Sequence, residues 1–226
     1  KNQLVRELLN NLSFELTNSQ KISIEEISND LSKSDRMIRL LQGDVGSGKT
    51  IVALAGLFHT AGSLKQGAMM APTELLARQH YEGIRDLCLK SNINVNILTG
   101  KTKQKDREII LKDLKEGKID IIIGTHALFQ EKVLFNDLGL VVIDEQHRFG
   151  VHQRLSLTSK SKDYPPDILI MSATPIPRTL ELTAFGSMQV SRLLDKPKGR
   201  KPIKTIAKPI NKISEVIDSI ERLINI

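Results

Sequence analysis

Apolar residues in this chain gather in short, nearly continuous runs that are separated by stretches with helical periodicity. The runs are Ile38–Leu41, Ala68–Ala71, Val95–Leu98, Ile119–Ile123, Leu138–Ile143 and Ile168–Met171. Most are β-branched or leucine-rich and lack polar alternation, which is typical of strands buried on both faces of a sheet. Between the runs, apolar spacing predicts helices at Thr50–Ala61, Glu74–Lys90, Lys103–Glu116 and Pro177–Phe185.

The alternation of these strands and helices predicts the fold class. Strands that alternate with helices form right-handed crossovers in a parallel sheet. We therefore expect an α/β fold that consists of a parallel sheet with helices on both faces. Ligands in such sheets bind beyond the carboxyl ends of the strands, so the residues that follow each apolar run are the first candidates for function.

The pattern changes near residue 194. Residues 195–209 are rich in proline, lysine and arginine, which predicts an exposed linker after a first domain at 1–194. Apolar residues then recur at helical spacing within 210–226; they are Ile213, Val216, Ile217, Ile220, Leu223 and Ile224. Two interpretations of this apolar face stay open. It packs back on the main sheet, or 210–226 is the start of a second, truncated lobe that holds its partner.

Composition adds modest constraints. A net charge of +7 favours an anionic partner, but only weakly by itself. The single cysteine, Cys88, excludes an internal disulfide and fits a reducing, cytoplasmic compartment. No apolar run approaches the roughly 20 residues that a membrane span requires, so we expect no membrane partner.

The segment Gly43–Thr50 matches a phosphate-binding loop (P-loop) between a predicted strand and a predicted helix. Its glycines let successive backbone N–H groups point at phosphate oxygens, and the next helix adds partial positive charge at its N-terminus. Lys49 would bind the β- and γ-phosphates of ATP, and the Thr50 hydroxyl would ligate Mg²⁺. The loop residues expected to bind nucleotide are Gly43, Gly46, Ser47, Gly48, Lys49 and Thr50. The alternative is a chance glycine-rich turn.

Two acids follow the apolar run Leu138–Ile143. Asp144 is expected to hold Mg²⁺, mostly through water, beside the P-loop of the same sheet. Glu145 is then placed to orient or deprotonate the attacking water. Together with Lys49, these acids form the expected catalytic set. The alternative is a strand-to-helix turn in which the acids cap the helix.

Four segments resemble motifs of the superfamily 2 helicases. Asp144–His147 is similar to their motif II, and Ser172–Thr174 is similar to motif III. Upstream of the P-loop, Leu16–Gln20 resembles their Q motif, and Pro72–His80 resembles motif Ia. The combination is far more specific than any one of these motifs.

Longer stretches narrow the resemblance to the RecG-like bacterial helicases, which remodel stalled replication forks. The stretches are Gly124–Gln130, Asp144–Gly150 and Ala173–Leu180. The alternative within this superfamily is the motor lobe of a transcription-repair coupling factor, which usually carries Glu at the position of Gln146. The run Met70–Glu74 also fits the RecG-like pattern better.

The resemblance implies a RecA-like P-loop lobe, the first of two lobes that enclose ATP and Mg²⁺. It further implies that Gln20 reads the adenine edge and that His147, Ser172 and Thr174 couple hydrolysis to movement. The whole protein would use ATP to remodel branched or forked DNA in repair and recombination. Its other parts would be a second helicase lobe, which supplies an arginine finger, and an N-terminal DNA-recognition domain.

In this family the strand-end loops touch the phosphate backbone of DNA. The candidates carried over by position are Thr73, Arg78, Gly100, Thr125 and His126. Hydroxyls, backbone N–H groups and arginines at helix starts can bind phosphate without reading sequence. Thr73 could instead be only a helix cap, and His126 only a partly buried, hydrogen-bonded histidine. Interleaved acids in the lysine-rich stretch Lys101–Lys118 favour a solvated helix face over a DNA surface.

Two functions from other classes remain as alternatives. A P-loop kinase that acts on a small molecule would need a lid and an acceptor pocket, and it would not need the Gln20, Thr73 and Ser172–Thr174 series. The other alternative is a non-enzymatic, ATP-dependent scaffold. A water-activating acid at Glu145 argues against such a scaffold.

Overall fold

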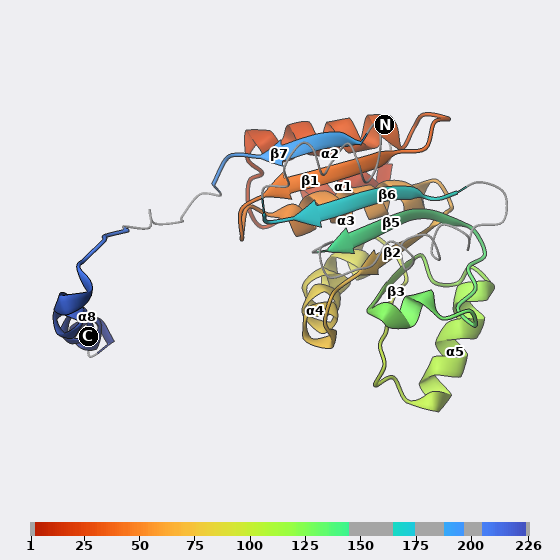
Figure 1. The fold of residues 1–226 in the computed structure, drawn as a ribbon. Helices are drawn as coiled ribbons and strands as arrows, with labels where there is room; N and C mark the ends of the chain where they lie inside the picture. The colour runs from red at the N-terminus through yellow and green to blue at the C-terminus, as the bar shows by residue number, and fades with distance from the viewer. Residues whose placement is uncertain (1–2, 145–164, 175–187, 197–204, 225–226) are drawn as a thin grey trace.

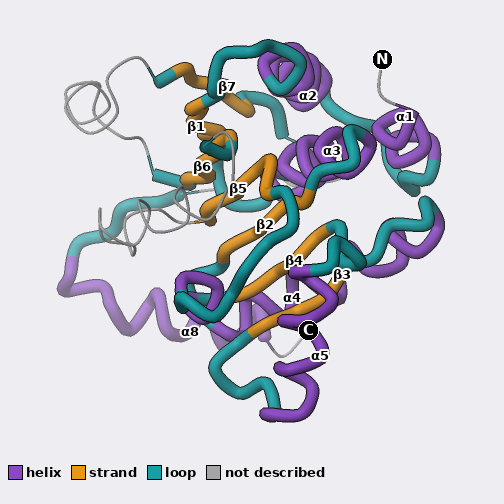
Figure 2. Tube along the Cα trace, turned by 90° about the vertical axis from the view of Figure 1, so that its right-hand side faces the viewer, coloured by secondary structure: helices purple, strands orange, loops and turns teal. Residues whose placement is uncertain are grey.

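The computed structural model of the chain describes residues 3–144, 165–174, 188–196 and 205–224. The described residues form one seven-stranded sheet in the order β3-β4-β2-β5-β6-β1-β7, and every neighbouring pair is parallel. Figure 2 shows the strands in this order. The strands are β1 Ile38–Gly43, β2 Gln66–Met70, β3 Val95–Leu98, β4 Ile121–Gly124, β5 Leu138–Asp144, β6 Asp167–Ser172 and β7 Gln189–Leu193. The parallel α/β fold expected from the sequence is confirmed.

Helices cover both faces of the sheet. They are α1 Gln3–Asn10, α2 Asn18–Asp30, α3 Lys49–Gly62, α4 Glu74–Lys90 and α5 Gln104–Lys115. A further helix, α8 Ile213–Ile224, and short 3₁₀ turns at His126–Phe129 and Ile210–Lys212 complete the described elements. One buried cluster joins one face of the sheet to α1, α2, α3 and α4. The other cluster packs α5 on the opposite face. None of the helices among the described residues is long and apolar enough to cross a membrane.

All six predicted strands are present, and three of the four predicted helices are confirmed as α3, α4 and α5. The predicted helix Pro177–Phe185 lies outside the described residues. Three elements were not predicted: α1, α2 and β7. The edge strand β7 alternates exposed and buried positions and carries two polar residues and an arginine, so it lacks the continuous apolar run of the inner strands.

The C-terminal helix α8 lies apart from the sheet (Figure 1). Its apolar face is open, since Ile213, Ile217 and Ile220 are 60%, 51% and 50% exposed. In the described residues this face is therefore not packed against the sheet. The division into a lobe at 1–194, a linker at 195–209 and a further unit at 210–226 stays a prediction.

A buried arginine ties α2 to the edge of the sheet. The Arg39 guanidinium, on β1, donates to Asp30 Oδ2 from Nε at 3.1 Å and to Glu26 Oε2 from Nη1 at 3.1 Å. It also donates to Ser191 Oγ on β7 at 2.8 Å and to the Gln189 side chain. Because Arg39 is only 6% exposed, this network holds one helix and two strands together where water cannot compete.

The same network changes the titration of Asp30. Burial acts to raise the pKa of this carboxyl, but hydrogen bonds from Lys33 and Arg39 and the charges of both outweigh it. The pKa of Asp30 therefore lies below its ordinary value. A carboxyl with a lowered pKa in the folded state stabilises the fold above its unfolded pKa, and that contribution is lost as the pH falls through its folded value.

We expect Arg39→Met to lower the free energy of unfolding by about 3 kcal/mol at neutral pH, because it leaves Asp30 buried without its main partner. Urea denaturation measures this difference. The matched control is Lys118→Met, which breaks an ion pair with Glu116 whose two side chains are 60% and 41% exposed, and which should change stability by under about 1 kcal/mol. The difference between wild type and Arg39→Met should shrink as the pH falls below the ordinary aspartate pKa of about 3.9 and on through the lowered pKa of folded Asp30. An equal effect of the two substitutions would contradict this prediction.

Candidate nucleotide site and strand-end loops

The P-loop lies at the carboxyl edge of the sheet, between the end of β1 and the start of α3. Gly46 and Gly48 have φ angles of 71° and 85°, a left-handed conformation that residues with a side chain rarely adopt. A Cβ added at Gly43 would meet Ser47 Oγ at 2.5 Å and Leu193 Cβ at 2.9 Å. The glycines at these three positions are therefore required by the backbone geometry of the loop itself. The strand–loop–helix context predicted from the sequence is present.

The loop offers the groups that a phosphate needs. The Ser47 hydroxyl is buried and has no hydrogen-bond partner among the described residues. Lys49 Nζ lies over the loop and donates to the carbonyl oxygens of Gly43 at 2.7 Å and Asp44 at 3.1 Å. The site thus combines a fixed cation, a helix N-terminus and a buried hydroxyl at one point.

Gln20 braces this loop from α2. Its side chain is buried, and its Nε2 donates to the backbone oxygen of Ser47 at 2.7 Å. Its Oε1 accepts from the backbone N–H of Thr17 at 2.9 Å, which completes a capping box at the start of α2. Sequence reasoning assigned Gln20 to the adenine edge and missed this structural contact. A side-chain amide has two hydrogens and two lone pairs, so the two contacts leave one of each for a ligand.

A cleft of ≈ 930 Å³ opens beside the P-loop, between α3, α4 and residues 12–15. Gln20, Gly48 and Thr50 line it, together with Phe14, which is 54% exposed. Much of the remaining wall is aliphatic, from Leu54, Leu76, Ile84 and Leu87. A mostly apolar cleft with a few polar groups at one end is typical of a site for a flat organic group attached to a charged one.

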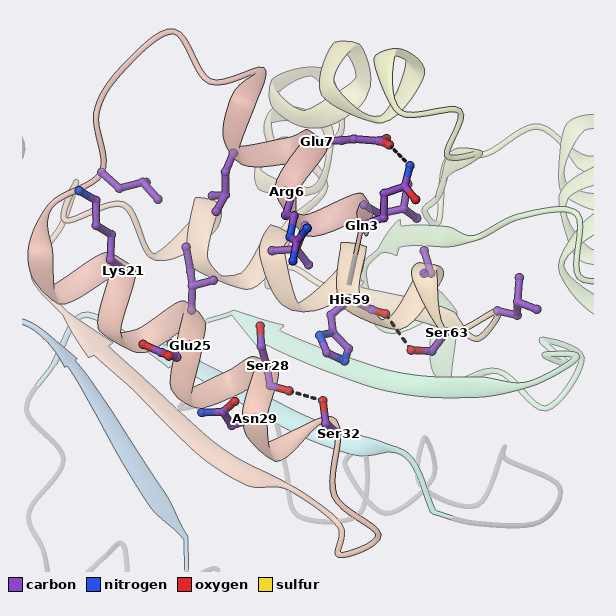
Figure 3. A pocket seen from close by; sticks show the side chains of 18 residues that line it. Gln3, Arg6, Glu7, Lys21, Glu25, Ser28, Asn29, Ser32, His59 and Ser63 are labelled. Carbon is purple, nitrogen blue, oxygen red and sulfur yellow. Dashed lines mark hydrogen bonds between the residues drawn. The ribbon is translucent and has the colours of Figure 1, made fainter. Parts of the chain in front are cut away.

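A second and larger cleft of ≈ 1160 Å³ lies between α1, α2 and the last turn of α3. Figure 3 shows that its lining mixes charges of both signs, with Arg6 and Lys21 beside Glu7 and Glu25. His59 and Ser63 belong to the end of α3 that is remote from the P-loop. Burial lowers the pKa of His59 below its ordinary value. No residue of Gly43–Thr50 lines this cleft, so it is separate from the nucleotide site.

Asp144 is the last residue of β5 and is 8% exposed. Its Oδ2 lies 2.9 Å from Nε2 of His80, a residue of α4. Sequence reasoning placed Asp144 at this edge but did not predict its contact with His80, because the two residues are far apart in the chain. Glu145 and His147 lie outside the described residues.

Ser172 and Thr174 lie next to the P-loop strand. Ser172 ends β6, and its Oγ accepts from the backbone N–H of Thr174 at 3.2 Å. Gln42 Nε2, one residue before the P-loop, donates to the carbonyl oxygen of Thr174 at 3.3 Å. The segment that resembles motif III therefore contacts the strand that leads into the P-loop.

The DNA-contact candidates lie at the ends of β2, β3 and β4. Thr73 caps α4, because its side chain accepts from the backbone N–H of Leu76 at 3.3 Å, and its role as a DNA contact stays a prediction. His126 is exposed, which makes the partly buried interpretation of this histidine wrong. Arg78 is half exposed and paired with Glu74 at 2.9 Å, and Gly100 has open space around it.

Thr125 differs from the other candidates because it is buried. It is 4% exposed, and its Oγ1 has no hydrogen-bond partner among the described residues. Nearby, Arg107 of α5 donates to Gln130 Oε1 at 2.5 Å and to the carbonyl oxygen of Thr99 at 3.3 Å, which joins two strand-end loops. Most of the other charged residues of Lys101–Lys118 are exposed, and Lys118, after this helix, pairs with Asp113 and Glu116. The solvated-face interpretation of this stretch stays a prediction.

Comparison with known proteins gives a consistent result. Residues 17–183 match the model of the DEAD/DEAH box helicase family. The chain is 52% identical over 201 residues to the ATP-dependent DNA helicase RecG of Staphylococcus epidermidis, and 50% identical over 204 residues to RecG of Bacillus subtilis. These matches cover 89% and 90% of this chain but 29% and 30% of the relatives, so the chain spans less than a third of their length.

Solved structures agree with the sequence comparison. A structure of RecG bound to a three-way DNA junction matches with a TM-score of 0.84 and 41% identity, and the match covers 97% of this chain and 29% of that one. The DEAD-box helicase Mss116 bound to single-stranded RNA matches with a TM-score of 0.71 at 18% identity, which covers 99% of this chain and 50% of that one. The latter likeness concerns the fold alone.

We expect Gly48→Ala to weaken nucleotide binding. The new Cβ would stand at a φ of 85° and 2.3 Å from Gln20 Nε2, so the loop or its brace has to move. A loss of about 1.4 kcal/mol in binding free energy lowers affinity about tenfold. A fluorescent ATP analogue titrated in the presence of Mg²⁺ measures it. The control is Gly117→Ala after α5, which has the same left-handed conformation with a φ of 73° but does not line the cleft beside the P-loop. If both variants bind as tightly as wild type, the loop does not need this geometry.

Proposed function

Because the chain belongs to the DEAD/DEAH box helicase family, we propose that it is the first motor lobe of a RecG-like DNA helicase. In this proposal ATP hydrolysis drives remodelling of branched DNA, such as stalled replication forks, during repair and recombination. The observation that carries it is the braced P-loop with Lys49 and the unpartnered Ser47 hydroxyl, at the same sheet edge as Asp144. The similarity to RecG sequences favours this reading over a transcription-repair coupling factor, a small-molecule kinase or a scaffold.

The P-loop residues fit ATP. Left-handed glycines allow backbone N–H groups of such a loop to turn toward phosphate oxygens, and Ser47 and Lys49 would add a hydroxyl and a charge. Phe14 and Gln20 line the cleft next to Gly48 and Thr50, and they would hold the adenine base there. Gln20 would then bind the base and brace the loop at once, so base recognition would act on the position of the phosphate site.

Mg²⁺ fits the pair Thr50 and Asp144, since hydroxyl and carboxylate oxygens are the ligands that this ion prefers. When bound, the metal would neutralise charge on the phosphates. Glu145, which follows Asp144 in the chain, would orient the attacking water and accept its proton. Lys49 would stabilise the charge on the transferred phosphoryl group.

The partners follow from the same proposal. DNA phosphates would bind at Thr73, Arg78, Gly100, Thr125 and His126, and a phosphate oxygen would satisfy the buried hydroxyl of Thr125. Ser172 and Thr174, with His147, would transmit the state of the nucleotide, because Thr174 contacts Gln42 beside the P-loop. The greater length of the relatives leaves room for a second lobe with an arginine finger and for an N-terminal domain that recognises forks.

The test compares three proteins for ATP turnover with and without forked DNA: the full-length protein, its Lys49→Ala variant and the 226-residue chain alone. We expect forked DNA to stimulate the full-length protein, and Lys49→Ala to abolish that activity. The 226-residue chain should turn over ATP about 10³–10⁵ times more slowly, since that is the effect of an arginine finger in related enzymes. Stimulation by a small molecule instead of DNA, or unwinding by the 226-residue chain alone, would overturn the proposal.

A second substitution separates binding from chemistry. Glu145→Gln keeps the shape of the side chain and removes its carboxylate, so it should leave Mg²⁺-dependent ATP binding intact while turnover falls by about 10²-fold or more. Equilibrium binding of a fluorescent ATP analogue and steady-state turnover measure the two effects. If Glu145→Gln hydrolyses its bound ATP at the wild-type rate, Glu145 does not activate the attacking water. Asp144→Asn is the companion variant and should alter the dependence on Mg²⁺.

A further inference from the structure

We propose that His80 is a positioning residue. It holds the Asp144 carboxylate in place for Mg²⁺ and connects the metal site to the DNA-facing start of α4. The identity of the ligands in this proposal rests on the proposed function. The His80–Asp144 contact itself joins two side chains of this chain and needs no assumption about ligands. His80 Nε2 and Asp144 Oδ2 are 2.9 Å apart, and the two side chains are 11% and 12% exposed.

The hydrogen bond has one consistent direction. An ionised carboxylate can only accept, so Nε2 of His80 carries the hydrogen and donates it to Oδ2. Oδ2 is thereby engaged, and Oδ1 is left for a metal-bound water. A partner that fixes the orientation of a metal-binding side chain typically affects metal affinity by 10-fold to 100-fold. His80 also lines the cleft beside the P-loop, but its effect on the metal would act through Asp144.

The sheet order gives this contact a second role. Asp144 ends β5, and β5 pairs with β2 on one side and with β6 on the other. Strand β2 leads through residues 71–73 into α4, the helix that carries His80. The nucleotide-site residues follow β1, β5 and β6, whereas the DNA-contact candidates follow β2, β3 and β4. His80 therefore spans the boundary between the two sets.

Helix α4 is packed along one face and capped at its start, so in this proposal it would shift as a unit. Ala77, Ile84 and Cys88 are buried along one face of its 17 residues, and burial raises the pKa of the Cys88 thiol to about 12, as expected for a packing residue. Thr73 caps the helix and Arg78 pairs with Glu74 in its first turns. A phosphate that binds at this end and shifts the helix would change the distance between His80 and Asp144. DNA binding would then alter the metal site directly within this lobe.

The test uses the full-length protein with His80→Ala, which removes the donor, and His80→Gln, which keeps an N–H donor near the same reach. Glu82→Ala is the matched control, because Glu82 is an exposed residue of the same helix. Two properties are measured. One is the Mg²⁺ concentration that half-saturates binding of a fluorescent ATP analogue, with binding in EDTA as reference. The other is the ratio of ATP turnover with forked DNA to turnover without it, at saturating Mg²⁺.

We expect His80→Ala to raise the half-saturating Mg²⁺ concentration about tenfold, to leave binding in EDTA unchanged and to lower the DNA-stimulation ratio. His80→Gln should recover most of both losses, and Glu82→Ala should match wild type. If His80→Ala does not fold, His80→Leu removes the same hydrogen bond and keeps more volume. Wild-type Mg²⁺ dependence in a folded variant without the donor would overturn the positioning role. A changed Mg²⁺ dependence with an unchanged stimulation ratio would overturn the link to DNA.

These outcomes are distinct from failure of the proposed function. If wild type itself shows no DNA-stimulated turnover, the helicase assignment fails. The Mg²⁺-dependent binding of nucleotide still decides whether His80 positions Asp144, because that measurement uses no DNA.

Discussion

The parallel direction of all seven strands is the constraint on which the rest of this lobe depends. The carboxyl ends of all the strands lie at the same edge of the sheet, so residues that are far apart in the chain come together there once the sheet has formed. Gly43, Asp144 and Ser172 reach that edge at the ends of β1, β5 and β6. Because the inner strands are buried on both faces, the edge and its loops are the places where polar side chains can be concentrated at little cost to the core.

Helix α2 converts this edge into a defined site. At its first turn Gln20 donates to the Ser47 carbonyl, and Asp195, just after β7, accepts from the backbone N–H of Ser19 at 2.8 Å. That hydrogen bond lowers the pKa of Asp195, as expected for a carboxylate that receives a helix N–H. At the other end of α2, the Asp30 carboxylate accepts a hydrogen bond from the buried Arg39 guanidinium. The helix is thus fixed at one end by contacts to the P-loop and to the residue Asp195 after β7, and at the other end by the contact to the start of β1. These contacts hold the P-loop brace in position.

Sequence patterns predicted what depends on local spacing. Inner strands buried on both faces, amphipathic helices and the glycine-rich loop each leave a contiguous signal, so the parallel sheet and the residues at its edge were predictable. The edge strand β7 has one exposed side and no such signal. The contacts of Gln20 with Ser47 and of His80 with Asp144 join residues 27 and 64 positions apart. Such pairs are created by packing, and no spacing rule within one chain can find them.

If the proposed function is right, the strand order also explains how one edge would serve both nucleotide and DNA. The order β3-β4-β2-β5-β6-β1-β7 divides the edge at the β2–β5 pair: the DNA-contact candidates lie on one side, and the P-loop, Asp144 and Ser172 lie on the other. Two ligands on separate halves do not compete for the same groups, yet each lies within a few strands of the other. Communication between them has to cross that single boundary, or travel through a neighbouring lobe. In the described residues, the side-chain contact between α4 and the end of β5 lies at this crossing. A packed element switches between discrete arrangements and does not deform continuously. A shift of α4 between two such arrangements would therefore be enough for ligand binding at one half of the edge to change the other half.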